Sequence, residues 1–237
     1  MLLDLLKDLG AGRVLTATTA TTGLDLAKTV DPQIIITEFA ASHFDGLDFV
    51  RCVRRSELDC RKAPVVMITA EATAQAIIGA RDAGVHEFLR KPFTLKDLTR
   101  RIEAVTLRTR DWVEAVRYIG PDRRRFNSAE YQGPRKRLSD TAGSRTDQAL
   151  RILKSAVAAI ETDPKQALRA MQAQAEDLSR VAASQADTRL AKHAAGLQSR
   201  LHQVVAAGRL DRGKIEAAAA PLLAQLPDEQ PVGGPRA

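Results

Sequence analysis

The sequence predicts an α/β domain with a parallel sheet, followed by a separate all-α helical bundle. Up to residue 107, short β-branched runs alternate with segments of helical periodicity, which is typical of parallel βαβ units. Beyond residue 145, the apolar residues recur only at helical spacing. A chain of 237 residues with 44% hydrophobic residues can bury two such cores.

Four strands are expected in the first domain, which we place at 1–107. They are short, rich in β-branched or apolar residues, and separated by helical segments. Their ranges are 13–17 (RVLTA), 34–37 (IIIT), 65–69 (VVMIT) and 85–89 (VHEFL). A helix at 94–107 follows, because Thr94 and Asp97 form a capping box and the next apolar residues fall on one face.

Four helices are expected at 146–226, where apolar stripes recur in four blocks with short connections. Asp163-Pro164 is typical of an N-cap followed by the first residue of a helix, and Gly208 is suited to end the third helix. These signals predict a small antiparallel bundle. The tail at 227–237 is rich in Pro and Gly, and we expect it to be disordered.

Residues 108–145 are expected to form a basic linker or an ordered arm. Gly120-Pro121 and Gly133-Pro134 prevent a continuous helix there. The segment holds ten Lys and Arg against five Asp and Glu, so most of the net charge of +7 lies in it. One phrase also occurs twice, YIGPDRRR and then YQGPRKRL, thirteen residues apart. Such a repeat either binds a partner or is part of a linker that needs only to be soluble and flexible.

The sequence predicts a cytoplasmic protein. No run approaches the roughly 18 to 20 apolar residues of a membrane span, and the opening MLLDLLKDLG lacks the basic leader and cleavage site of a signal peptide. Cys52 and Cys60 form neither a disulfide framework nor a metal-ligand pattern, which indicates a reducing compartment.

Three stretches of the first domain carry a family resemblance: PQIIITEFAASHFDGLDFVRCVR, APVVMITA and ARDAGVHEFLRKPFTLKDLTRRI. In this order and spacing they resemble the receiver domain of response regulators, the CheY-like, flavodoxin-like module of two-component signalling. The resemblance implies that Thr69 and Lys91 sense a phosphoryl group and that Phe88 is the aromatic residue that rotates inward. The family's spacing places Glu38 where the phosphate-accepting Asp is expected.

Two departures from the family shape our functional hypothesis. Glu38 is already anionic and one methylene longer than Asp, so we do not expect normal aspartyl-phosphate chemistry. The chain also begins inside the family's first helix, so the sheet is expected to lack its first strand and the acidic pair that binds Mg²⁺. We therefore expect no cofactor, and we expect a pseudo-receiver that works without phosphorylation.

Alternatives to this hypothesis remain open. The true start can lie upstream of Met1, which would make the protein a conventional response regulator or a phosphotransfer protein. In a chain that does start at Met1, the segment 13–17 can move beside 34–37, or a second molecule can fill the gap.

The basic segment suggests a nucleotide ligand. Arginine can stack on a base and pair with phosphate, and tyrosine adds a stacking face. A receiver followed by an arginine-rich tail resembles CheY-like regulators that bind cyclic di-GMP, which would replace phosphate as the switch. The candidate ligand-binding residues are Tyr118, Arg123, Arg124, Arg125, Tyr131, Arg135 and Arg137. The alternatives are a solvated connector and a DNA-binding regulator; nucleic acid is not our expected partner.

The helical segment is expected to bind a protein partner, together with the receiver face, or to form a homodimer. Neither His193 nor His202 has the H-x-x-K-G context of a phosphotransfer histidine, because Ala194, Ala195 and Gly196 follow His193. No motif of a cyclase, phosphodiesterase, kinase or hydrolase is present in the sequence. We therefore predict a signalling and binding protein rather than an enzyme.

Overall fold

The computed structural model describes residues 2–41, 44–70, 72–123 and 142–226. They form two compact units. Residues up to 113 and 117–123 belong to the first unit, while 114–116 and the C-terminal helices belong to the second. The helices of the first unit are α1 (Leu2–Asp8), α2 (Ala20–Val30), α3 (Gly46–Arg55), α4 (Ala74–Asp82) and α5 (Leu95–Thr106), with a 3-10 turn at Asp59–Lys62. Its strands are β1 (Ile35–Glu38), β2 (Ala40–Ala41), β3 (Phe44–Asp45), β4 (Val65–Thr69) and β5 (Glu87–Arg90), followed by β6 (Trp112–Glu114) and β7 (Ile119–Pro121).

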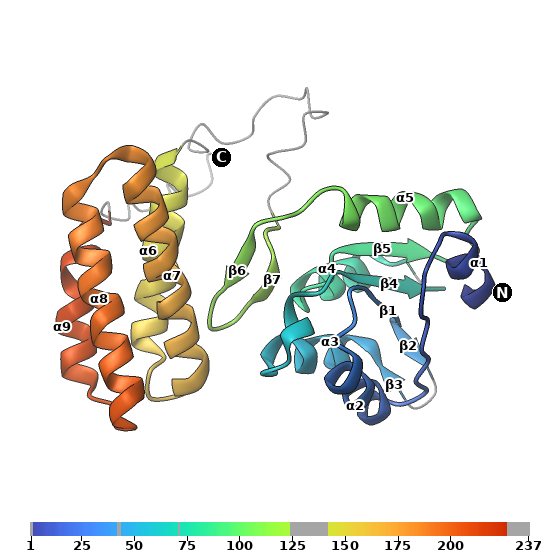
Figure 1. Ribbon diagram of the computed structural model, residues 1–237, viewed down its shortest axis with the longest axis horizontal. Helices are drawn as coiled ribbons and strands as arrows, with labels where there is room; N and C mark the ends of the chain where they lie inside the picture. Colours follow the sequence, from blue (N-terminus) through green and yellow to red (C-terminus); the bar gives the residue numbers. More distant parts are fainter. Residues whose placement is uncertain (1, 42–43, 71, 124–141, 227–237) are drawn as a thin grey trace, which may run out of the picture. The chain divides into compact units, whose positions relative to one another are not determined.

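A three-stranded parallel sheet in the order β1-β4-β5 lies at the centre of the first unit. Its central strand β4 is buried along its whole length, as expected for a parallel sheet covered on both faces. Residues of α3 and α4, with Leu24 of α2, pack on one face. Residues of α1 and α5 pack on the other (Figure 1). The predicted α/β architecture is therefore confirmed, and α5 begins at the predicted capping box of Thr94 and Asp97.

The segment 13–17 does not form the strand that its β-branched sequence predicts. Among the described residues, β1 pairs only with β4, so 13–17 does not move beside 34–37 either. A β-type sequence stays in a strand only when a neighbouring strand supplies its ladder of hydrogen bonds. Here Val14 instead packs on the apolar cluster of α1 and α5, while Leu15 is 43% exposed. A side chain, rather than a backbone ladder, anchors this segment.

The chain after α5 returns to the first unit as the strands β6 and β7, which form a two-stranded sheet. All three residues of β7 are buried. Gly84, with φ of +91°, lets β7 approach closely: a Cβ atom there would lie 2.4 Å from the carbonyl oxygen of Ile119. A Cβ atom on Gly120 would lie 2.7 Å from the Cα of Gly84. Two glycines that face each other thus allow this backbone contact.

The buried side chain of Arg54 holds the same region by hydrogen bonds. It lies on α3, is 1% exposed, and directs its guanidinium at backbone carbonyls rather than at a carboxylate. Nε and Nη2 donate to the Gly84 carbonyl at 3.1 and 2.9 Å, and Nη1 donates to the carbonyls of Arg61 and Ala63 at 2.6 and 2.9 Å. Nη2 also lies 3.3 Å from Nδ1 of His86. Burial lowers the pKa of Arg54 to about 10.

The described residues of the second unit form four helices, as the sequence predicts. They are α6 (Ala142–Ala158), α7 (Pro164–Gln185), α8 (Thr188–Ala207) and α9 (Arg212–Leu223). Each packs on the next, and α9 closes on α6 to form a four-helix bundle around a core of Leu, Ala, Ile and Met side chains (Figure 1). Asp163 caps α7 with Pro164 in the first turn, and Gly208 ends α8 in the left-handed conformation. Both predicted helix boundaries are confirmed.

Two glutamines of α7 hold Glu114 and Ala115 within the helical unit. Gln166 Nε2 donates to the buried carboxylate of Glu114 at 2.9 Å and to the carbonyl of Ala115 at 3.1 Å. Gln174 Nε2 donates to the carbonyl of Glu114 at 3.0 Å. Gln166, Gln174 and Glu114 are all nearly inaccessible to solvent, so these bonds satisfy groups that would be costly to bury unpaired.

Candidate functional site

The carboxyl ends of β1, β4 and β5 lie together at one edge of the parallel sheet, and three of the candidate residues stand there. Glu38 ends β1, Thr69 ends β4, and Lys91 follows β5 directly. The ladder fixes their separation, because Glu38 is in register with Ile68 and Thr69 with Arg90. In parallel α/β sheets this edge is the usual place for a binding site. The residues that the resemblance singles out are therefore neighbours in space.

Glu38 and Lys91 form a direct ion pair. Lys91 Nζ donates to Glu38 Oε1 at 2.6 Å, across 53 residues of sequence. Both side chains are partly exposed, 40% for Lys91 and 53% for Glu38, so water screens the pair. Exposed pairs contribute only about 0–1 kcal/mol. The bond is therefore informative about side-chain position rather than about stability.

Thr69 and Phe88 complete this candidate set. Thr69 is almost completely buried at the end of β4, and its carbonyl accepts a hydrogen bond from the Lys91 backbone N–H at 2.6 Å. Phe88 is partly buried and packs on the apolar cluster that α3 and α4 form with the sheet. The ring of Phe88 thus faces the α4 side of β5.

The resemblance to receiver domains implies a Mg²⁺ site at this edge of the sheet. Within the described ranges, no group of three His, Cys, Asp or Glu side chains lies close enough to hold a metal ion. Mg²⁺ prefers several oxygen ligands in octahedral geometry. Glu38 contributes one carboxylate and is already paired with Lys91. The residues described at this edge do not fit a Mg²⁺ site.

The first copy of the repeated phrase begins a second candidate site. The guanidinium of Arg123 stacks on the ring of Tyr118, 3.7 Å from its centroid, and pairs with Asp82 at 3.1 Å. The Tyr118 hydroxyl donates to the Pro121 carbonyl at 2.6 Å, and burial raises the pKa of Tyr118. The other candidate ligand-binding residues lie outside the described ranges: Arg124, Arg125, Tyr131, Arg135 and Arg137.

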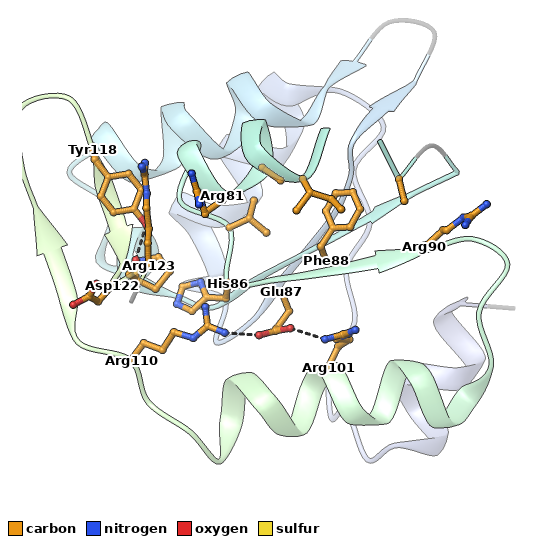
Figure 2. A pocket seen from close by; sticks show the side chains of 15 residues that line it. Arg81, His86, Glu87, Phe88, Arg90, Arg101, Arg110, Tyr118, Asp122 and Arg123 are labelled. Atoms are coloured by element: carbon orange, nitrogen blue, oxygen red, sulfur yellow. Dashed lines mark hydrogen bonds and ion pairs between the residues drawn. The ribbon is translucent and has the colours of Figure 1, made fainter. Parts of the chain in front are cut away.

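A pocket of about 390 Å³ opens beside this stack, between α4, β5 and α5. We call it the arginine pocket. Arg81, Arg90, Arg101, Arg110 and Arg123 line it, together with the apolar side chains of Ile77, Val85 and Phe88. Figure 2 shows Tyr118, Arg123 and Arg110 at one end and Phe88 and Arg90 at the other. The pocket therefore has arginine side chains and an aromatic ring at each end.

Two carboxylates neutralise part of this charge. Glu87, which is almost fully buried, accepts from Arg101 at 2.9 Å and from Arg110 at 2.5 Å (Figure 2). Asp82 is shared in the same way by Arg81, at 3.4 Å, and Arg123. Each of these two carboxylates thus faces two arginines, and the pocket keeps an excess of positive charge.

His86 also lines the pocket, and it is neutral. Its Nδ1 accepts a hydrogen bond from the Val65 backbone N–H at 3.2 Å, so the ring proton resides on Nε2. Burial, followed by the charges of Arg54 and Arg110, lowers the pKa of His86 to about 3. His86 thus adds no cation at neutral pH.

Sequence reasoning did not identify the arginine pocket. Arg81 lies in α4, Glu87 in β5 and Arg110 in the connection after α5, and only the fold brings them together. One signal was visible for Arg54, which follows Val50 and Val53 on the buried stripe of α3, where an apolar residue is expected. An arginine on such a stripe indicates a buried structural cation.

The bundle histidines are both accessible on α8. His202 Nδ1 lies 2.9 Å from the carbonyl of Gln198 one turn earlier, which fixes the ring. His193 is partly buried.

Comparison with known proteins finds sequence relatives for the first unit. Residues 1–103 match the response regulator receiver domain. The chain is 33% identical over 102 residues to the chemotaxis protein CheY-3 of Vibrio cholerae, covering 43% of this chain and 78% of that protein. It is 35% identical over 102 residues to the chemotaxis protein CheY of Pseudomonas aeruginosa, covering 43% and 82%. A crystal structure of Vibrio cholerae CheY4 aligns with 44% of this chain and 86% of its own, at 26% identity and a TM-score of 0.42.

The parallel sheet, the helices on both of its faces and these sequence relatives define a signalling module of two-component systems. Through its first unit, the chain belongs to the response regulator receiver family, with a CheY-like receiver domain. None of the described helices is long and apolar enough to span a membrane.

Proposed function

We propose that the protein is a pseudo-receiver: a cytoplasmic signalling adaptor, and not an enzyme, that works without phosphorylation. The observation that carries this proposal is the 2.6 Å bond between Glu38 and Lys91. In the receiver family, the corresponding lysine contacts the phosphoryl group. Here the ammonium group of Lys91 already donates to a carboxylate oxygen of Glu38. The ion pair stands in for the contact that phosphorylation would create, and the domain acts through protein partners that bind the receiver face and the helical bundle.

A phosphodonor assay tests this proposal. The full chain is incubated with radiolabelled acetyl phosphate and Mg²⁺, with Glu38→Ala as the matched control. We expect the natural chain to incorporate no more label than the control, because Glu38 is engaged by Lys91 and the described residues form no group of three or more metal-ligating side chains. Labelling that exceeds the control and maps to Glu38 would refute the pseudo-receiver.

A second measurement addresses the ion pair itself. Glu38→Gln removes the charge that holds Lys91 while keeping nearly the same side-chain shape. We expect faster amide hydrogen exchange at 88–93, where Lys91 follows β5. Glu103→Gln, on the exposed side of α5, serves as the control and should leave this exchange unchanged.

The ligand part of the proposal is that cyclic di-GMP switches the adaptor through the arginine-rich segment. Its support is the stacking of Arg123 on Tyr118, which presents a guanidinium already oriented by an aromatic ring. Calorimetry would compare the natural chain with the triple variant Arg123→Ala, Arg124→Ala and Arg125→Ala, using GTP and a generic oligonucleotide as controls. Selective binding that the triple variant abolishes supports the switch; equal binding of all three ligands reduces the segment to a nonspecific cationic linker.

A further inference from the structure

The arginine pocket has the features of a binding site rather than of a gap in packing. It is built from α4, β5, the α5 region and the Tyr118–Arg123 segment, all within the first unit. Its volume of about 390 Å³ lies near the small end of the roughly 300–1,000 Å³ that small-molecule sites occupy. Such a volume suits one nucleotide-sized molecule better than a larger ligand.

The charge of the pocket selects an anion. Its five arginines face three carboxylates: Glu87 and Asp122, which also line it, and the neighbouring Asp82. Glu87 holds Arg101 and Arg110 in place, so their positive charge is positioned by a buried anion before any ligand arrives. Groups that are already oriented lose less conformational entropy on binding.

The shape of the pocket adds a requirement for a flat or apolar body. The Arg123 guanidinium lies on the Tyr118 ring, and Phe88 stands toward the opposite end of the pocket (Figure 2). Stacking on aromatic and guanidinium faces is typical of nucleobase recognition, while Arg donors suit phosphate. An inorganic anion would use only half of these groups.

We infer that the arginine pocket binds a mononucleotide, with its phosphate toward Arg81, Arg110 and Arg123 and its base toward Phe88. The site shares Phe88 with the receiver candidate set but includes neither Glu38 nor Lys91, so it does not depend on the ion pair that carries the pseudo-receiver proposal. It shares Tyr118 and Arg123 with the cyclic di-GMP proposal, but it depends on Arg81 and Arg110, which lie outside the repeated phrase.

Calorimetric titration of the full chain with GMP and with AMP tests the inference. Guanosine and inorganic phosphate provide the two halves of the ligand. We expect at least one nucleotide to bind with submillimolar Kd and each half to bind at least tenfold more weakly. Arg81→Gln should weaken nucleotide binding at least tenfold, whereas Arg100→Gln, an exposed arginine of α5 outside the pocket, should leave it unchanged.

Thermal unfolding of each variant shows whether the fold is retained, and Arg123→Gln supplies a second pocket variant if Arg81→Gln is unstable. Absence of binding by both nucleotides at millimolar concentration overturns the inference, as does binding that neither pocket variant weakens. Titration with cyclic di-GMP separates the two proposals: if it fails to bind while a mononucleotide binds, the cyclic di-GMP switch is refuted and the pocket inference stands. Cyclic di-GMP binding without mononucleotide binding refutes the pocket inference alone.

Discussion

Replacing Arg54 with Met should destabilise the first unit by about 3–5 kcal/mol. Methionine fills a similar volume but removes all five N–H donors, which serve the carbonyls of Arg61, Ala63 and Gly84 and the ring of His86. Each buried acceptor left without a partner costs about 1–3 kcal/mol. Three carbonyls alone would give roughly 3–9 kcal/mol.

The lower half of this range is the better expectation, because two effects oppose the loss. Removing Arg54 also relieves the cost of burying its charge, which is visible in its lowered pKa of about 10. Water can enter and rebind some carbonyls. The bonds to Arg61 and Ala63 are also only partly buried, so a loss of about 3–5 kcal/mol is expected, a large part of the 5–15 kcal/mol that stabilises an ordinary domain.

The protein offers a direct assay for this prediction. Trp112 is the only tryptophan of the chain, and the Arg54 guanidinium lies 5.2 Å from its ring centroid. Urea unfolding followed by tryptophan fluorescence therefore reports on the first unit, while far-ultraviolet circular dichroism also follows the bundle. Arg51→Met, an exposed position of α3, is the control and should change the free energy of unfolding by less than about 0.5 kcal/mol. If Arg54→Met lowered the free energy of unfolding by less than about 1 kcal/mol, the stabilising role of the Arg54 hydrogen bonds would be refuted.

Three further predictions concern the same two units. The pKa of His86 is about 3 in the folded protein and 6.5 in an unfolded chain. Between these pH values the unfolded chain binds one more proton than the folded protein. The free energy of unfolding should therefore fall on acidification, by about 2 kcal/mol between pH 6.5 and 5. His86→Gln should flatten this slope in tryptophan-detected urea unfolding; an unchanged slope would assign it to other groups. Gly120→Ala should cost about 1–3 kcal/mol by the same assay, because its Cβ would lie 2.7 Å from the Gly84 Cα; a neutral effect would show that β7 can shift freely. Gln174→Leu should lower bundle stability by about 1–3 kcal/mol in circular dichroism melts, since it removes a buried hydrogen bond to the Glu114 carbonyl; a more stable variant would contradict this.

Sequence reasoning succeeded where a local signal and its structural consequence lie close together in the chain. The strand at 65–69 matches β4 residue for residue, because a run of buried β-branched and apolar residues has no other stable place in such a domain. The capping box at Thr94 and the cap at Asp163 are likewise local hydrogen bonds that the residue types alone predict.

Sequence reasoning was less successful where distant segments decide the outcome. The segment 13–17 has a β-type sequence, but no ladder stabilises it, so it is not a strand. At the candidate site, the order of the strands brought Glu38 and Lys91 to one edge, as the resemblance implied. The arginine pocket depends on a return of the chain after α5, for which the linker sequence contains no periodic signal.

The contact between Gly84 and Gly120 has a practical consequence for dissecting the protein. A receiver fragment that ended at 107, after α5, would uncover the surface on which Ile119 is buried and would remove the ring of Trp112 from Arg54. Such a fragment would expose apolar surface and tend to aggregate, whereas one that extends through Arg123 would keep Ile119 beside Gly84 and the ring of Trp112 beside Arg54. The residue at which an isolated receiver fragment ends would therefore decide whether its measured properties are those of the intact domain or of a destabilised one.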